Sequence, residues 1–444
     1  MLYESKQYSF LKIMNKIYIN IKNRIFNNEF NKNVLILSGG TIIAQILPIA
    51  VSPIITRLYE PIDFGVLALF VSITSIVSVI ANGRYELAIM IPEKDNDAIN
   101  VAAVSVVFNI FIILSFFIII LIFKQSFLKI IKAEHLSFWI YFAPLTVFFS
   151  GIFLILSNTN NRFKLYKDIS KATILRTVSG SFIQIIMGFL KTGVSGLISG
   201  QIVSQTVANI KLFFNIKNTG LLREVNIEKM KKMAIIYKDF PRYSIPAALF
   251  DTISIQIPIF MFSILFKSNE LVGHYSMANR ILTIPFSFIA TSIAQVFYQS
   301  FSKLKQKPKD QIKLLLSTWK KLGIIGFFPF FIISIYGEII FSVFLGNKWK
   351  EAGKIASILA PMIFTMFISS PTSTAYLTLG MQNIAFYFGL FSFIIRPLSI
   401  YIGYYLKSIY IGIFIMVLLE IFQIIIYNVI LILKLKIRLR KINL

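Results

Sequence analysis

Residues 99–123 read INVAAVSVVFNIFIILSFFIIILIF, a run of 25 residues that contains no Asp, Glu, Lys or Arg. About 20 apolar residues in a helix, at a rise of 1.5 Å each, cross the hydrocarbon core of a bilayer. The whole chain has the same character: of its 444 residues 56% are hydrophobic and 14% charged, and its mean hydropathy is +0.75. An average soluble domain carries about 25% charged residues. The sequence therefore predicts an all-α polytopic membrane protein.

Comparable apolar runs recur along the chain. We predict about 12 transmembrane helices, with these ranges: 34–56, 65–83, 99–123, 137–157, 170–190, 194–216, 244–266, 273–298, 322–345, 352–379, 384–405 and 409–433. The segments between them are short, so they leave no room for a separate catalytic domain on either side of the membrane.

The residues that enzymes and metal sites need are scarce. The chain has no Cys, which excludes disulfides, zinc fingers and thiol catalysis, and its 2 His argue against a histidine-based metal site. The P-loop, GxSxG and HExxH patterns are absent. Asp95 and Asp97 form a short acidic motif, which we expect to be a solvated turn. We predict no catalytic residue, no metal and no cofactor, and a secondary transporter rather than an enzyme.

The net charge of +26 is distributed unevenly over the two sides of the predicted spans. With the N-terminus in the cytoplasm, 31 of the 45 Lys and Arg residues lie on the cytoplasmic side and 10 on the opposite side. Cytoplasmic loops of membrane proteins carry such an excess. We therefore expect both termini in the cytoplasm, and the charge needs no nucleic acid partner to explain it.

The spans form two sets of six. We predict an N-lobe at 34–216, a basic cytoplasmic linker at 217–243, a C-lobe at 244–433 and a basic cytoplasmic tail at 434–444. Apolar residues at helical spacing within 1–33 favour an amphipathic helix in the cytoplasmic interface, with a frayed basic tail as the alternative.

Weak similarity between the two halves indicates an internal duplication. Gln45 precedes Gly65 by 20 residues, and Gln256 precedes Gly273 by 17, in similar surroundings. Six spans per half make this a parallel repeat. Transporters often carry repeats, with the binding site between the lobes and access alternating by rocking.

Two opposite charges lie at similar predicted depth near the membrane midplane. Arg396 is twelve residues into one span, and Glu420 is eleven residues into the next, which runs in the opposite direction. An ionisable group at this depth usually faces a partner or a wet cavity. Either the two residues form a static, self-neutralising pair, or Glu420 takes a proton or cation and frees Arg396 for an anion. In the second case Glu420 is the ion-coupling residue.

Further Arg and Gln residues in or beside the spans are candidates for contacting a phosphorylated sugar substrate. The planar, permanently charged guanidinium forms paired hydrogen bonds with phosphate, and neutral amides suit sugar hydroxyls. The candidates are Arg84, Arg176, Arg280, Arg396, Gln45 and Gln256. For any single amide, hydrogen bonding between helices is the plainer interpretation.

Six stretches of the chain resemble sequence elements of a known family. They are TRLYEPIDFG at 56–65, GRYELAIMIP at 83–92, NRFKLY at 161–166, DFPRYSIP at 239–246, VGHYSMA at 272–278 and WKEAG at 349–353. They resemble the polysaccharide transporter family, the O-antigen (Wzx-type) flippases of the multidrug/oligosaccharidyl-lipid/polysaccharide exporter superfamily, whose fold is also that of the MATE transporters.

The resemblance implies a function and a location. It implies a multi-pass protein of the bacterial inner membrane that flips an undecaprenyl-diphosphate-linked oligosaccharide, such as an O-antigen or capsule repeat unit, towards the periplasm. It also implies two six-helix lobes around a cationic cavity and an ion gradient as the energy source. The implied partners are the lipid-linked oligosaccharide, membrane lipids and other membrane proteins of glycan assembly.

Two other functions remain as alternatives. A drug/cation antiporter of the same superfamily would need an acidic cavity, whereas Arg outnumbers acidic residues in the middle of these spans. A membrane-embedded glycan polymerase or ligase would need a large periplasmic loop, and the longest one predicted here, 124–136, is short.

Overall fold

The computed structural model describes residues 29–218 and 220–443, which form helices joined by short turns, with no strand among them. The first half contains α2 (Glu29–Leu58), α3 (Pro61–Ala81), α4 (Asp95–Ile130), α5 (Ala143–Arg162), α6 (Tyr166–Phe189) and α7 (Val194–Asn218). The short α8 (Ile227–Ile236) lies in the linker. The second half contains α9 (Ile245–Phe266), α10 (Asn269–Lys303), α11 (Pro308–Leu345), α12 (Lys350–Ser369), α13 (Thr374–Thr378), α14 (Gln382–Tyr405) and α15 (Ile409–Asn443). The amphipathic helix expected at 1–33 lies almost wholly outside the described residues.

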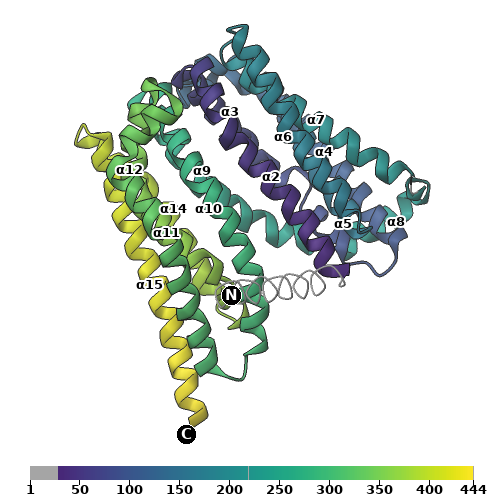
Figure 1. Ribbon diagram of the computed structural model, residues 1–444. Helices are drawn as coiled ribbons and strands as arrows, with labels where there is room; N and C mark the ends of the chain where they lie inside the picture. The colour runs from purple at the N-terminus through teal and green to yellow at the C-terminus, as the bar shows by residue number, and fades with distance from the viewer. Residues whose placement is uncertain (1–28, 219, 444) are drawn as a thin grey trace, which may run out of the picture.

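Helices α2–α7, here called the N-lobe, lie on one side of the molecule, and α9–α15, the C-lobe, on the other (Figure 1). The packing repeats between the lobes. In the N-lobe α2 packs on α6, α4 on α5, α6 on α7 and α5 on α7; in the C-lobe α9 packs on α14, α11 on α12, α14 on α15 and α12 on α15. This repetition of helix contacts favours an internal duplication. The bounds of the two lobes, 34–216 and 244–433, remain a prediction from the sequence.

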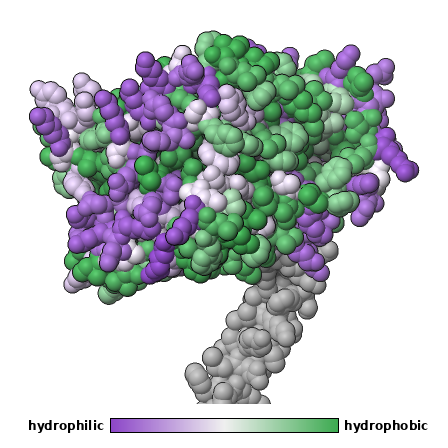
Figure 2. Space-filling view, turned by 90° about the horizontal axis from the view of Figure 1, so that it is seen from above, coloured by the Kyte–Doolittle hydropathy of each residue, from purple (hydrophilic) through white to green (hydrophobic). Residues whose placement is uncertain are grey.

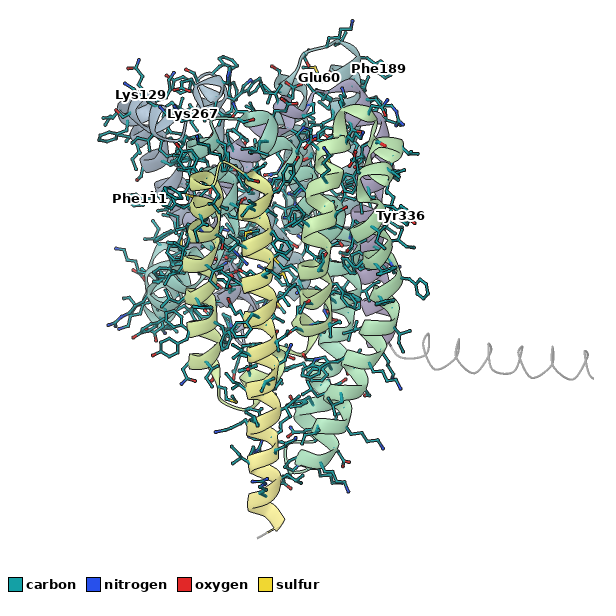
Figure 3. The ribbon with its side chains drawn as sticks, turned by 90° about the vertical axis from the view of Figure 1, so that its left-hand side faces the viewer. Glu60, Phe111, Lys129, Phe189, Lys267 and Tyr336 are labelled. Atoms are coloured by element: carbon teal, nitrogen blue, oxygen red, sulfur yellow. The ribbon has the colours of Figure 1, made fainter. Side chains whose placement is uncertain are left out.

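The lobes meet along α3 and α10 and diverge towards the end of the molecule that holds the C-terminus (Figure 1). We call the opposite end, which carries Glu60, Lys129, Phe189 and Lys267, the distal end (Figure 3). Seen from above, patches of hydrophilic residues alternate there with hydrophobic ones (Figure 2).

Two glycines allow the lobes to approach each other. A Cβ atom on Gly65 of α3 would lie 1.7 Å from the carbonyl oxygen of Asn269, and one on Gly273 of α10 would lie 1.9 Å from that of Pro61. Any side chain at either position would therefore clash with the backbone of the other helix. These are the two glycines that the sequence repeat pairs, and in the structure they face each other.

The surface of the helices is apolar, as a bilayer requires. Phe111 on α4 and Tyr336 on α11 are both exposed on the outside of the bundle (Figure 3). In the described part of the chain 11 helical segments are long and apolar enough to cross a membrane. The one predicted span outside this set is α7, whose Ser, Thr, Gln and Asn residues lower its hydropathy although it is a helix of 25 residues.

Two predicted spans are confirmed as membrane-spanning segments but differ in detail from the helices, and one prediction about local structure is wrong. The helix predicted at 99–123 extends over Asp95–Ile130, because hydropathy marks the apolar core of a helix and not its polar ends. Asp95 and Asp97 therefore lie in the first turn of α4, where acidic side chains interact favourably with the helix dipole, and not in a solvated turn. The span predicted at 352–379 breaks after Ser369 into a short 3₁₀ turn containing Pro371 and then α13, since proline at 371 cannot continue the hydrogen-bond ladder.

Candidate functional site

Arg280 lies in a cavity at the contact between the two lobes. The cavity has a volume of about 160 Å³ and is lined by residues of α3, α9 and α10, among them Ala68, Gln256 and Ser276. The Arg280 side chain is accessible to solvent, and it makes no hydrogen bond or ion pair with any residue that the structure describes. None of the lining residues is acidic. Arg280 therefore gives this cavity an uncompensated positive charge.

A second, smaller cavity places Arg280 next to the N-lobe. Its lining combines Arg280 with Ser52 of α2 and Gln184 of α6. Two amides nearby, the candidate Gln256 and also Gln184, already have one partner each. Gln256 accepts a hydrogen bond from Ser72 at 2.8 Å, and Gln184 donates one to the Leu197 carbonyl at 3.2 Å. Each amide keeps further hydrogen-bonding capacity. Arg280, Gln256 and Gln184 thus form one polar region between the lobes.

Arg396 and Glu420 meet inside the C-lobe. The Arg396 Nε atom lies 2.9 Å from Glu420 Oε1, and its Nη1 donates to the Ser254 hydroxyl at 3.1 Å. Glu420 is 3% exposed and also accepts a hydrogen bond from Ser392 at 3.4 Å. Gln423 completes the group by donating to Ser392 at 2.8 Å. We call these five residues the C-lobe cluster.

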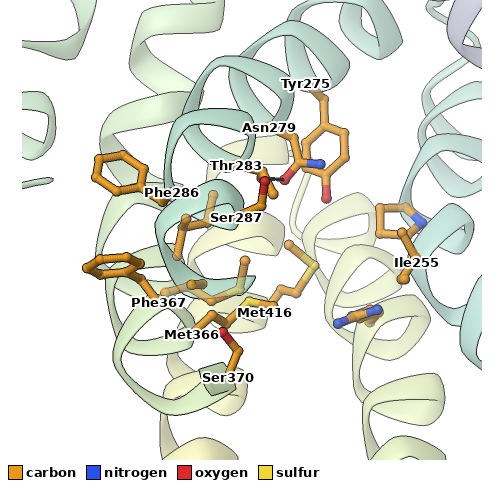
Figure 4. A pocket seen from close by; sticks show the side chains of 15 residues that line it. Ile255, Tyr275, Asn279, Thr283, Phe286, Ser287, Met366, Phe367, Ser370 and Met416 are labelled. Carbon is orange, nitrogen blue, oxygen red and sulfur yellow. Dashed lines mark hydrogen bonds between the residues drawn. The ribbon is translucent and has the colours of Figure 1, made fainter. Parts of the chain in front are cut away.

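Two cavities lie on either side of Arg396. One, of about 250 Å³, runs between α9, α10, α12, α14 and α15, and its wall combines Asn279 and Thr283 with Phe286, Met366 and Met416 (Figure 4). The other, of about 260 Å³, contains Glu420, Gln423 and several serines. Arg396 therefore borders both cavities and Glu420 borders the second, so a water molecule, an ion or a substrate group could enter beside the ion pair.

Arg84, Arg176 and Gln45 line none of these four cavities. Arg84 follows α3 and lies 3.7 Å from Glu86. Burial raises the pKa of the Glu86 carboxyl, and the nearby Arg84 charge opposes that shift. Arg176 stacks its guanidinium over the Phe153 ring, 4.8 Å from the centroid, and Gln45 has a buried carbonyl oxygen without a described partner. The structure thus divides the six predicted substrate residues among several places.

Ser254 and Ser392, which form hydrogen bonds with the ion pair, were not among the residues predicted from the sequence. A signal for Ser392 was present, because Ser392 and Arg396 are four residues apart and Glu420 and Gln423 three, so each pair lies on one helix face. Ser254 gave no such signal, since its contact with Arg396 depends on how α9 packs against α14. No group of three or more His, Asp or Glu side chains that could hold a metal occurs within residues 29–218 and 220–443.

Solved structures of known membrane transporters have the same fold. An inward-facing multidrug resistance MATE family transporter of the MOP superfamily matches with a TM-score of 0.66 and 17% identity, over 88% of this chain and 95% of that one. The lipid II flippase MurJ, in an inward closed conformation, matches with a TM-score of 0.63 and 14% identity, over 91% of this chain and 90% of that one. At these identities the likeness concerns the fold alone, and it confirms the predicted all-α, MATE-like architecture.

Sequence relatives point to polysaccharide biosynthesis. The teichuronic acid biosynthesis protein TuaB of Bacillus subtilis (strain 168) is 30% identical over 124 residues, which are 28% of this chain and 25% of that protein. The chain thus spans about a quarter of the length of this relative. A family model described as "polysaccharide biosynthesis protein" matches residues 54–354, well over half of the chain. The chain is therefore a member of the polysaccharide biosynthesis protein family.

Proposed function

We propose that this protein is a flippase that moves a diphosphate-linked lipid oligosaccharide across the bacterial inner membrane by ion-coupled alternating access. Membership of a polysaccharide biosynthesis family and the fold shared with a lipid II flippase support a transporter of lipid-linked glycan rather than an enzyme. The partner is the lipid-linked oligosaccharide itself, held among membrane lipids.

Arg280 is the observation that carries this proposal. It is a guanidinium without a counter-ion among residues 29–218 and 220–443, in a cavity that both lobes help to form, and a diphosphate would supply the missing negative charge. Gln256 and Gln184 lie beside it and offer hydrogen-bonding groups to a sugar. A drug/cation antiporter would need the opposite charge, and neither cavity around Arg280 has an acidic residue in its lining.

The distal end faces the periplasm in this proposal. The Lys and Arg excess of the linker, the segment 303–321 and the C-terminal tail lies at the other end, which fits the cytoplasmic side. Because the lobes meet at the distal end and diverge away from it, this conformation is the one that loads substrate from the cytoplasm.

The C-lobe cluster couples transport to an ion in this proposal. Glu420 neutralises Arg396 in the present conformation. A proton or cation on Glu420 would remove that neutralisation and leave Arg396 with an unpaired charge next to a cavity of about 250 Å³. The pair could therefore switch between two charge states during the transport cycle.

Deletion of the gene, with complementation by variants of Arg280, tests the proposed function. We expect the deletion strain to accumulate a lipid-linked glycan in the cytoplasmic leaflet, and the wild-type gene to clear it. Arg280→Ala should fail to clear it, and Arg280→Lys should clear it poorly, because lysine keeps the charge but loses the paired hydrogen bonds. Arg223→Ala, on an exposed cytoplasmic turn, is the matched control. Normal clearance by Arg280→Ala at normal abundance would refute the role of Arg280.

A further inference from the structure

Three of the stretches that carry the family resemblance meet at the distal end, although they are far apart in the sequence. Trp349, which is fully buried, packs edge-on against Phe64 with ring centroids 5.1 Å apart and against His274 at 5.7 Å. These residues come from α3, α10 and the short turn η6 (Asn347–Trp349) between α11 and α12. The function proposed above does not use this contact, which joins the N-lobe to the C-lobe.

Backbone carbonyls at the C-terminal end of α2, in the N-lobe, accept hydrogen bonds from side chains of the C-lobe. The Trp349 indole donates to the Thr56 carbonyl at 3.0 Å, and the Lys348 ammonium donates to the Arg57 carbonyl at 3.4 Å. The last four carbonyls of a helix have no partner within the helix. Two such carbonyls of α2 are therefore satisfied from the other lobe.

Backbone carbonyls at the C-terminal end of α11, in the C-lobe, accept hydrogen bonds from side chains of the N-lobe. The Thr56 hydroxyl shares its one proton between the Leu345 carbonyl at 2.9 Å and the Ser52 carbonyl of its own helix at 2.8 Å. The Arg57 guanidinium donates to the Phe344 and Val343 carbonyls at 3.3 and 3.2 Å. Thus side chains of α2 cap the end of α11, and side chains of η6, the turn that follows α11, cap the end of α2, across the lobe boundary.

An ion pair completes the contact. Lys348 lies 2.9 Å from Glu60, the residue before α3, and the close approach of Gly65 and Gly273 lies beside it at the start of α3 and α10. Tyr59 keeps α2 and α6 together at the same level by donating to the Gln184 carbonyl at 2.6 Å. Burial, with the nearby charge of Asp63, raises the pKa of Tyr59 to about 12, so its hydroxyl remains a donor.

We propose that η6 and the facing ends of α2 and α11 form an outer latch, which holds the periplasmic side shut and must open to release the cargo. This inference rests on the alternating access proposed above. Unsatisfied carbonyls in the hydrocarbon core cost several kcal/mol each, but at the membrane surface water replaces the lost partners. Reciprocal capping at the distal end can therefore be made and broken in each cycle. The same bonds at the midplane would be far harder to break.

Thiol labelling from outside the cell tests the latch. The chain has no Cys, so Ser276→Cys, about one helical turn deeper than Gly273, gives a single thiol behind the latch. Thr56→Val removes one donor of the latch with little change in volume, and Trp349→Phe removes the indole donor together with one of its two rings. A membrane-impermeant maleimide should label each variant about 2- to 10-fold faster than the parent, the factor expected from one hydrogen bond.

Trp319→Phe is the matched control, because the Trp319 indole donates to Thr372 at 2.9 Å entirely within the C-lobe. It should leave the labelling rate unchanged. Equal rates in the parent, Trp349→Phe and Thr56→Val would refute the latch. The assay requires no knowledge of the cargo, so an error in the proposed substrate would leave its result intact.

Cross-linking gives a second test. A cross-linker that carries two maleimide groups joined by a reducible disulfide should link Glu60→Cys to Lys348→Cys and stop glycan export, and reduction of its disulfide should restore export. The control pair is Glu338→Cys with Lys350→Cys, which replaces an ion pair of 3.0 Å between α11 and α12 of one lobe and should leave export unchanged when cross-linked. Full export with the Glu60–Lys348 link in place would show that this contact does not open in the cycle.

Discussion

In the ion pair of Arg396 and Glu420, each charged side chain depends on the opposite charge of the other to be stable inside the membrane. Each charge alone would be expensive at this depth. The contact of 2.9 Å, the hydrogen bond that Arg396 donates to Ser254 and the one that Glu420 accepts from Ser392 offset that cost. Loss of one partner leaves the other as a buried, unpaired charge, which costs about 3–5 kcal/mol. Loss of export in a single variant therefore cannot by itself separate a structural role from a functional one.

A double substitution can separate them. Replacing both partners of a buried pair by apolar residues is often neutral for stability. We expect Arg396→Leu with Glu420→Leu to insert and accumulate normally yet to export no glycan, and Glu420→Gln alone to lose sensitivity to a proton uncoupler. Abundance by immunoblot and export in the complemented deletion strain provide the measurements. Recovery of export in the double variant would mean that the pair is only structural.

Among the helices, α3 and α10 set how closely the lobes can approach. Their contact at Gly65 and Gly273 has no space for one additional methyl group. By contrast, a Cβ atom on Gly323 of α11 would lie 3.9 Å from its nearest neighbour, which is ordinary van der Waals contact. Gly65 of α3 and Gly323 of α11 can therefore be compared directly: packing requires the first glycine and does not require the second.

Alanine substitution makes that comparison measurable. Gly65→Ala should destabilise the protein by about 1–3 kcal/mol, since overpacking forces the backbones apart. Gly323→Ala should be neutral or stabilise by up to about 1 kcal/mol, because alanine favours the helix. Thermal unfolding in detergent would show both effects. A melting temperature for Gly65→Ala at or above that of the parent would contradict the close packing of α3 on α10.

Sequence patterns predicted the helices well and their ends poorly. Apolar runs mark the part of a helix inside the hydrocarbon, so the cores of all twelve predicted spans are helical, whereas α4 continues beyond them at both ends. The contact between Arg396 and Glu420 was also predictable, because opposite charges at equal depth attract strongly. The isolation of Arg280 was not, since it depends on which face of α10 turns towards the N-lobe.

At the scale of the whole molecule, two similar lobes meet at one end and diverge at the other (Figure 1). In the arrangement that we propose, the lobes rock about the contact of α3 and α10, and the cavity around Arg280 opens first to one side and then to the other. This requires the distal end to lie in the periplasm.

Reporter fusions test that orientation. Alkaline phosphatase is active only in the periplasm, so a fusion at Lys129, at the distal end, should be active (Figure 3). Fusions at Lys232, in α8, and at Lys307, just before α11, should be inactive, and a cytoplasmic reporter at the same sites should give the opposite pattern. Phosphatase activity from the Lys307 fusion would invalidate the arrangement of the C-lobe.

The most direct test of the central claim is lipid transfer by the purified protein in liposomes. A fluorescent, diphosphate-linked lipid oligosaccharide is placed in both leaflets, and its accessibility to an impermeant quencher is followed with and without a proton gradient. We predict that the protein transfers the lipid faster than empty liposomes do, that the gradient gives the transfer a direction, and that Arg280→Ala slows it about tenfold or more. Transfer by Arg280→Ala at the wild-type rate, or no transfer by the wild-type protein, would contradict the account.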